Sequence, residues 1–196
     1  MNNSPEHQAF PQPGDALIVV DVQNDFLPGG SLAVPDGDAV IPVLNQYIRL
    51  FTERGLPVFA TREMHPPNHA SFKSEGGLWP PHCVPGTHGA EFASGLQLPA
   101  GVDIISKANQ PELDVYSGFQ ATDLTKKLKK LKVKRLWIGG LATDYCVLYT
   151  VLDALRLGFE VFVLEDAVRA VDVRPDDGAK AIQEMRDHGA ILRRIS

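Results

Sequence analysis

The sequence predicts an α/β protein: a three-layer α/β/α sandwich on a mostly parallel, doubly wound sheet of six strands. Two observations lead to this prediction. Short apolar runs rich in β-branched residues recur along the chain, and segments with the helical spacing of apolar residues alternate with them. Such alternation is typical of parallel strands that are joined by helices on both faces of a sheet. A chain of 196 residues, 44% of them hydrophobic, suits one domain rather than two.

The predicted strands are short, apolar and bounded by Gly, Pro or Asp. The first, Ala16-Leu-Ile-Val-Val20, has no alternation of polar residues, so we expect both of its faces to be buried. The strands are expected over residues 16–20, 57–61, 102–106, 135–138, 160–164 and 190–194.

The predicted helices carry apolar residues at positions i, i+3, i+4 and i+7. In the first, over residues 40–51, Asp36 or Asp38 can cap the start and Gly55 can end the helix. The other helical patterns are a leucine stripe at Leu124, Leu128 and Leu131, an apolar stripe over 148–155 closed by Gly158, and a segment near 176–188.

Composition excludes several classes of function. The net charge of −5 disfavours a general nucleic-acid role, and no apolar run approaches the 18 residues of a membrane span. The basic run 126–135 is better explained as the solvated face of a helix. Residues 1–13 are polar and lack the pattern of a signal peptide, so we expect a flexible lead, then a single catalytic domain over 14–196. Two cysteines suit a reducing compartment, the cytoplasm.

Three reactive side chains follow predicted strands. Asp21 ends the first strand, Lys107 ends the third, and Cys146 lies after the fourth, in the first turn of the next helix if Thr143 or a neighbour caps it. The carboxyl ends of parallel strands share one edge of a sheet, so an acid, an amine and a thiol can meet there. An ammonium and a helix N-terminus favour the nucleophilic thiolate, and a carboxylate can accept the thiol proton.

Each of these residues also has an ordinary structural explanation. Cys146 can be a small buried hydrophobe, Asp21 can fasten the loop after its strand, and Lys107 can be a solvated lysine. The catalytic interpretation therefore depends on their joint placement.

Histidines gather in the aperiodic segment 62–101. Four of the six lie in one window, at His65, His69, His82 and His88. Glu63 and His65 are two residues apart and project to the same side of an extended segment. A carboxylate with imidazoles is a common ligand set for a catalytic divalent metal, although loop histidines without a metal remain the alternative. Cys83, beside His82, is a further possible ligand.

Several segments together resemble the nicotinamidase/pyrazinamidase branch of the isochorismatase-like cysteine hydrolases. The resemblance spans about residues 15–195, and the histidine loop is its most specific part. The segments are Asp21-Val-Gln-Asn-Asp-Phe26, His65-Pro-Pro-Asn-His-Ala-Ser-Phe72, Trp79-Pro-Pro-His-Cys-Val84, Gly86-Thr-His-Gly-Ala-Glu-Phe92, Ser117-Gly-Phe119 and Gly140-Leu-Ala-Thr-Asp-Tyr-Cys-Val147.

The resemblance implies roles for particular residues. Asp21, Lys107 and Cys146 match the catalytic triad, and the backbone amides of Ala142 and Cys146 match the oxyanion hole. The bond between Leu141 and Ala142 matches a position that is cis in the family. The matched metal ligands are Glu63, His65 and His82. The matched substrate-binding aromatics are Phe26 and Trp79, with Tyr116 nearby.

One departure concerns the metal site. Glu63 stands where the family usually has Asp, and His69 is left open as a further ligand. The implied cofactor is one divalent ion, zinc before iron or manganese.

The implied function is hydrolysis of nicotinamide to nicotinate and ammonia through a cysteine thioester, with pyrazinamide as a second substrate and a role in NAD salvage. The partner is then a small amide, not nucleic acid or a membrane, and a homo-oligomer stays open. Two alternatives stay open as well. One is a related cysteine amidase acting on a carbamoyl or ureido substrate, and the other is a metal-stabilised binding protein on the same scaffold.

Overall fold

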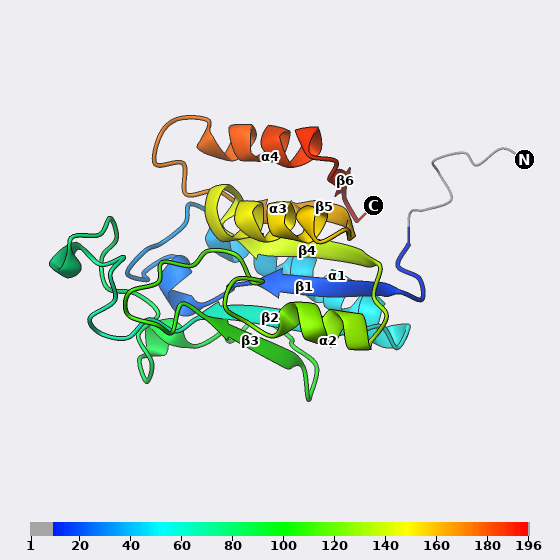
Figure 1. The fold of residues 1–196 in the computed structure, drawn as a ribbon, viewed down its shortest axis with the longest axis horizontal. Helices are drawn as coiled ribbons and strands as arrows, with labels where there is room; N and C mark the ends of the chain where they lie inside the picture. Colours follow the sequence, from blue (N-terminus) through cyan, green and yellow to red (C-terminus); the bar gives the residue numbers. More distant parts are fainter. Residues whose placement is uncertain (1–9, 196) are drawn as a thin grey trace, which may run out of the picture.

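A computed structural model describes residues 10–195, so most of the predicted lead over 1–13 lies outside the described residues. Its six strands form one sheet in the order β3-β2-β1-β4-β5-β6, and every pair is parallel (Figure 1). The chain fills one half of the sheet outward from β1 and the other half outward from β4, which is the doubly wound arrangement predicted. The strands are β1 (Asp15–Val20), β2 (Val58–Glu63), β3 (Asp103–Lys107), β4 (Arg135–Leu141), β5 (Glu160–Arg169) and β6 (Ile191–Arg193).

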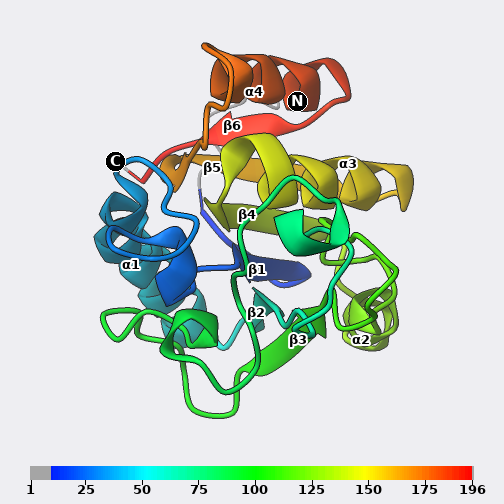
Figure 2. The ribbon, with the colours of Figure 1, turned by 90° about the vertical axis from the view of Figure 1, so that its left-hand side faces the viewer.

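Helices cover both faces of the sheet, as predicted. Helix α1 packs on one face, and α2, α3 and α4 lie on the other (Figure 2). The helices are α1 (Val40–Glu53), α2 (Leu124–Lys130), α3 (Leu148–Arg156) and α4 (Asp177–Asp187). Gly55 and Gly158 follow α1 and α3 with positive φ angles of 65° and 85°, so both end their helices as the sequence indicates.

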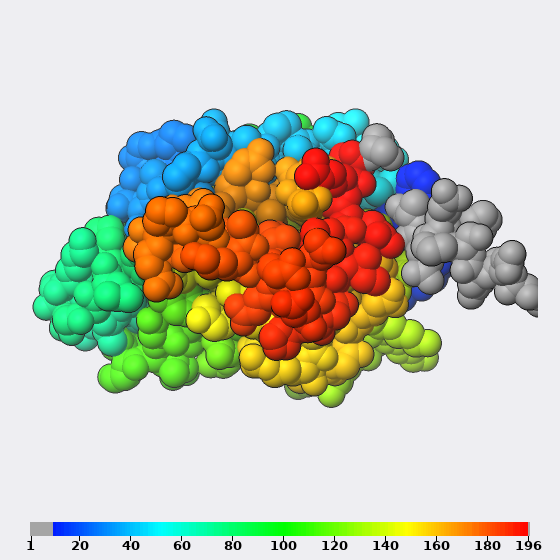
Figure 3. Space-filling view, turned by 90° about the horizontal axis from the view of Figure 1, so that it is seen from above, coloured from blue at the N-terminus to red at the C-terminus, as the bar shows by residue number. Residues whose placement is uncertain are grey.

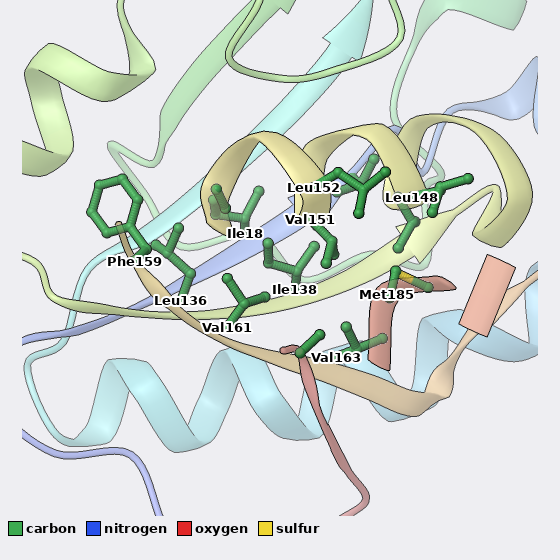
Figure 4. Packing of buried hydrophobic residues seen from close by; sticks show 14 of the residues in the cluster. Ile18, Leu136, Ile138, Leu148, Val151, Leu152, Phe159, Val161, Val163 and Met185 are labelled. Carbon is green, nitrogen blue, oxygen red and sulfur yellow. The ribbon is translucent and has the colours of Figure 1, made fainter. Parts of the chain in front are cut away.

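Alternating residues of the central strands divide the core into two. Leu17 and Val19 of β1 face α1, whereas Ile18 faces α3. Figure 4 shows the cluster on the α3 side of the sheet, in which Leu148, Val151 and Leu152 of α3 lie against side chains of the sheet, of α4 and of the residue before β5. The partners labelled there are Ile18, Leu136, Ile138, Phe159, Val161, Val163 and Met185.

Three details differ from the prediction. Neither Asp36 nor Asp38 caps α1 with its side chain, because a 3-10 turn over Gly37–Ala39 precedes the helix. Leu131 lies just after α2 and is 51% exposed, so it does not continue the leucine stripe of the core. Strand β5 runs to Arg169, five residues beyond its apolar run.

The long segment between β2 and β3 lies at the carboxyl ends of the strands. It contains two 3-10 turns, Lys73–Glu75 and His88–Ala90, and otherwise has no regular structure. In Figure 3 its teal part protrudes at one end of the molecule, beside the orange loop that leads into α4. Among residues 10–195, none of the helices has the length and apolar character needed to cross a membrane.

Leu136, in a central strand, and Leu131, just after α2, provide a test of the core. Leu136 is fully buried, so Leu136→Ala should lower the free energy of unfolding by about 2–5 kcal/mol. The matched change Leu131→Ala, at an exposed position, should cost less than about 0.5 kcal/mol. Urea denaturation measures both, and equal losses would contradict the packing described.

Candidate active site

Three strands end in ionisable side chains that meet at one edge of the sheet. Asp21 follows β1, Glu63 ends β2 and Lys107 ends β3, and all three residues are at most 3% exposed. The Lys107 ammonium lies 3.0 Å from Asp21 Oδ2 and 2.8 Å from Glu63 Oε1. A buried ammonium thus lies between two carboxylates. The sequence placed Asp21 and Lys107 at this edge, but it assigned Glu63 only to the metal site.

The turn after β4 brings the thiol to the same point. Gly140 has a φ of 128°, and a Cβ there would overlap the Val20 carbonyl, so only glycine allows β4 to pass so close to β1. The Leu141–Ala142 bond that follows is cis, as the resemblance implied. Cys146 Sγ then lies 3.3 Å from Lys107 Nζ.

The helical environment of Cys146 differs from the simple first turn expected. Thr143–Val147 form a π-helical turn, and α3 begins only at Leu148. Ala142 is the N-cap residue, and no side chain caps the turn, so Thr143 does not have the predicted capping role. Single π-helical turns of this kind occur frequently at functional sites.

Burial and charge set the protonation of this cluster. Burial disfavours the ammonium, but its two carboxylate partners and the sulfur outweigh that effect and raise the pKa of Lys107 well above its ordinary value. Burial raises the pKa of the Cys146 thiol well above its ordinary value, and Lys107 opposes the shift. Burial also raises the pKa of Asp21, again against Lys107. The resting cluster therefore holds a charged lysine beside a neutral thiol.

Two residues that the sequence analysis missed hold Asp21 and Glu63 in place, one by its side chain and the other by its backbone. Thr61 donates its hydroxyl to Asp21 Oδ1 at 2.6 Å. The Gln23 amide accepts the Glu63 backbone N–H at 2.8 Å and donates to the Glu63 carbonyl at 2.9 Å. Gln23 lies in the segment Asp21-Val-Gln-Asn-Asp-Phe26, which resembles the family, so this segment was the signal that could have pointed to Gln23.

Glu63 also belongs to a buried group with His65 and His82, whose ligand atoms all lie within 4.8 Å of one another. The His82 ring places Nδ1 2.8 Å from the Pro80 carbonyl and Nε2 3.2 Å from Glu63 Oε2. Such a bond on the far side of the ring is how proteins orient an imidazole ligand. One carboxylate and two imidazoles, closely spaced and buried, fit a divalent metal ion.

Burial and neighbouring charges also set the protonation of Glu63 and His65. Burial lowers the pKa of His65 to about 4, so this ring is neutral and can offer a lone pair. Burial works against ionisation of Glu63 too, but Lys107 and the histidines hold the pKa of this carboxyl well below its ordinary value. The site therefore presents an anionic oxygen and a neutral imidazole to a cation.

His69 and Cys83 lie close to this group but have other surroundings. His69 accepts the Ser71 backbone N–H at its Nδ1 at 3.2 Å, and its Nε2 lies 3.2 Å from the Leu113 carbonyl. Both of its ring nitrogens thus have protein partners outside the group of Glu63, His65 and His82, so we propose that His69 orients the loop rather than binds the ion. Cys83 is fully buried, and burial raises the pKa of its thiol, so it is an inert thiol beside the metal group.

A pocket of about 430 Å³, counting the space at its open mouth, joins both groups. The predicted aromatics Phe26, Trp79 and Tyr116 line it, and Trp79 Nε1 donates to the Tyr116 hydroxyl at 3.1 Å. The lining residues that the sequence analysis did not name are Leu32, Ser71, Asp114, Tyr145 and Val171. This lining of aromatic side chains with a few polar groups suits a small organic ligand whose reacting group faces Cys146.

Comparison with known proteins identifies the family. Residues 15–195 match the isochorismatase domain. The chain belongs to the isochorismatase family. Nicotinamidase of Escherichia coli is 41% identical to this isochorismatase-family chain over 92% of it and 94% of that protein. Nicotinamidase/pyrazinamidase of Mycobacterium tuberculosis is 38% identical over 87% of this chain and 94% of that protein.

A solved structure agrees with the family assignment. Pyrazinamidase of Pyrococcus horikoshii in complex with zinc superposes with a TM-score of 0.89 at 51% identity, covering 93% of this chain and 100% of that one.

The metal group can be tested by paired histidine variants. His82→Ala removes a proposed ligand and should lower zinc affinity by more than about 100-fold, beyond what loss of an outer partner costs. His69→Ala should lower it by less than about tenfold, because both of its nitrogens are bonded elsewhere. Chelator competition measures both affinities. A larger loss for His69→Ala would make His69 a ligand.

The loop beside the metal group should show pH-dependent stability. Burial opposes ionisation of Asp25, but hydrogen bonds from Cys83 and Ser31 outweigh it and lower the pKa of this carboxyl. Because the folded pKa is the lower one, the stabilisation is complete above the unfolded pKa near 3.8 and is lost as pH falls through the folded pKa.

Asp25→Asn should therefore cost about 2 kcal/mol at pH 7 and flatten the loss of stability below roughly pH 5. Urea denaturation across this range gives both quantities. The exposed Asp38→Asn is the matched control. A variant whose acid profile matches the unmodified protein would show that Asp25 does not carry this dependence.

Proposed function

We propose that the protein hydrolyses nicotinamide to nicotinate and ammonia through a thioester on Cys146, that it accepts pyrazinamide, and that it serves NAD salvage. The observation that carries the proposal is the Lys107 ammonium, which lies 3.3 Å from Cys146 Sγ and within 3.0 Å of two carboxylates, while Cys146 and the proposed metal ligands line one pocket. The similarity to curated nicotinamidases supports the substrate, as does PnC1 of L. infantum in complex with nicotinate, with a TM-score of 0.88 at 35% identity.

The first step is formation of the nucleophile. Asp21 accepts the thiol proton, and its raised pKa makes it a better base than an exposed aspartate. The Lys107 ammonium stabilises the thiolate that results, because it keeps its own proton in this anionic cluster.

The thiolate then attacks the carboxamide carbon, and the carbonyl oxygen takes up negative charge. The backbone N–H groups of Ala142 and Cys146, both in the pocket lining, are the proposed donors to this oxyanion. Asp21 returns its proton to the departing ammonia, which leaves the acyl group on Cys146. Water then hydrolyses the thioester and releases nicotinate and the thiol.

Glu63, His65 and His82 are the proposed holders of a divalent ion. When bound there, the ion supplies a Lewis acid that can hold a ring nitrogen of the substrate. We propose zinc, supported by the zinc complex of the pyrazinamidase from Pyrococcus horikoshii, with iron or manganese as alternatives that metal analysis of the purified protein distinguishes.

The aromatic pocket explains the proposed preference for a flat heterocycle. Phe26, Trp79 and Tyr116 line it, and a neutral pyridine ring can stack or meet them edge-on. The proposed partner is thus a small neutral amide rather than nucleic acid or a membrane surface. The proposed location is the cytoplasm, which two unpaired cysteines suit.

The two cysteines give the decisive variants. Cys146→Ala should reduce ammonia release from nicotinamide by more than about 10³-fold, since the nucleophile is lost. Cys83→Ala should keep activity within a few-fold, because Cys83 is fully buried and does not line the pocket. An ammonia-release assay with nicotinamide, pyrazinamide and a ureido compound measures this. Activity that survives in Cys146→Ala, or that is confined to the ureido compound, would overturn the proposal.

A further inference from the structure

Glu63 takes part in both buried groups, with one oxygen in each. Oε2 lies 3.2 Å from His82 Nε2 and 3.7 Å from His65 Nδ1. Oε1 lies 2.8 Å from Lys107 Nζ and accepts a hydrogen bond from Cys146 Sγ at 3.2 Å. A single carboxylate therefore contacts the metal-ligand histidines and the reacting thiol.

The length of the side chain is what makes this double contact possible. The Gln23 amide fixes the Glu63 backbone on both its N–H and its carbonyl, so the main chain cannot shift to compensate for a shorter residue. An aspartate at this position would be shorter by one methylene, or about 1.5 Å. From the same backbone it could not keep both sets of contacts.

Resting on the function proposed above, we propose that Glu63 is a positioning residue that links the metal site to the nucleophile: Oε2 binds the ion, while Oε1 holds the Lys107 ammonium and the Cys146 thiol. The thiol then has two carboxylates beside it, Glu63 and Asp21, whose facing atoms lie within 4.8 Å of one another and of the sulfur. The Lys107 ammonium lies within 3.3 Å of Asp21, Glu63 and the Cys146 sulfur. These three residues with Lys107 therefore form an ion-pair cluster and not a metal site.

The link has a direction that follows from electrostatics. A cation at Oε2 draws negative charge toward itself and weakens Oε1 as an acceptor. The thiol is thereby released from Glu63 and is left to Asp21, the proposed base. Occupation of the metal site should thus be felt at the sulfur, even with no substrate present.

The experiment compares the rate at which iodoacetamide alkylates Cys146 in metal-free and zinc-loaded protein at one pH. Mass spectrometry of the Cys146 peptide separates it from Cys83. In the unmodified protein, zinc should raise the rate about tenfold, as expected when a hydrogen bond to a charged acceptor is weakened. In Glu63→Asp, which keeps the carboxylate but not its reach, the ratio should fall to about two.

A second variant and a control complete the test. Glu63→Gln keeps the shape but is a weaker acceptor, so its metal-free rate should already approach that of the zinc-loaded unmodified protein. The exposed Glu53→Asp should leave the tenfold ratio unchanged. Metal analysis confirms that Glu63→Asp is loaded at the zinc concentration used.

A zinc ratio that is the same in Glu63→Asp and the unmodified protein, or zinc that slows alkylation, would overturn the link. Neither readout requires turnover. If the unmodified protein fails to release ammonia from nicotinamide, the proposed function is wrong, while the alkylation ratios still decide the role of Glu63.

Discussion

The buried ammonium of Lys107 is the constraint on which the rest of the site depends. Removing an ion from water costs several kcal/mol, so the fold can tolerate this charge only if anionic partners are held at bonding distance. Asp21 and Glu63 meet that need at 3.0 and 2.8 Å. Their positions follow from the sheet, where Glu63 and Lys107 are directly paired across β2 and β3. A slip of one residue would turn one of them to the opposite face.

The same charge organises the chemistry around it. Burial raises the pKa of both thiols, those of Cys83 and Cys146, so each rests protonated. Cys146 differs because the turn after β4 places its sulfur 3.3 Å from the ammonium, and the close passage of Gly140 beside β1 allows that turn. Glu63 belongs both to this cluster and to the group with His65 and His82, so the two buried groups are physically continuous.

Much of this arrangement could be predicted from the sequence, because the spacing of apolar residues and the order of strands and helices along the chain can be read directly from it. The alternation of strands and helices predicted the sheet, and the strand ends predicted that Asp21, Lys107 and Cys146 would meet. The second contact of Glu63 could not be predicted, since it depends on the reach of one side chain from a backbone that Gln23 fixes. Helix ends were also missed where a tighter or wider turn replaced a side-chain cap.

The central claim is that the ammonium cluster makes Cys146 a nucleophile that carries the acyl group. The most direct measurement is mass spectrometry of protein quenched in acid during turnover of nicotinamide. The account predicts a nicotinoyl group, labile to base, on the Cys146 peptide and none on the Cys83 peptide. Steady turnover with no acyl group on Cys146 at any quench time, or with the group on another residue, would contradict it.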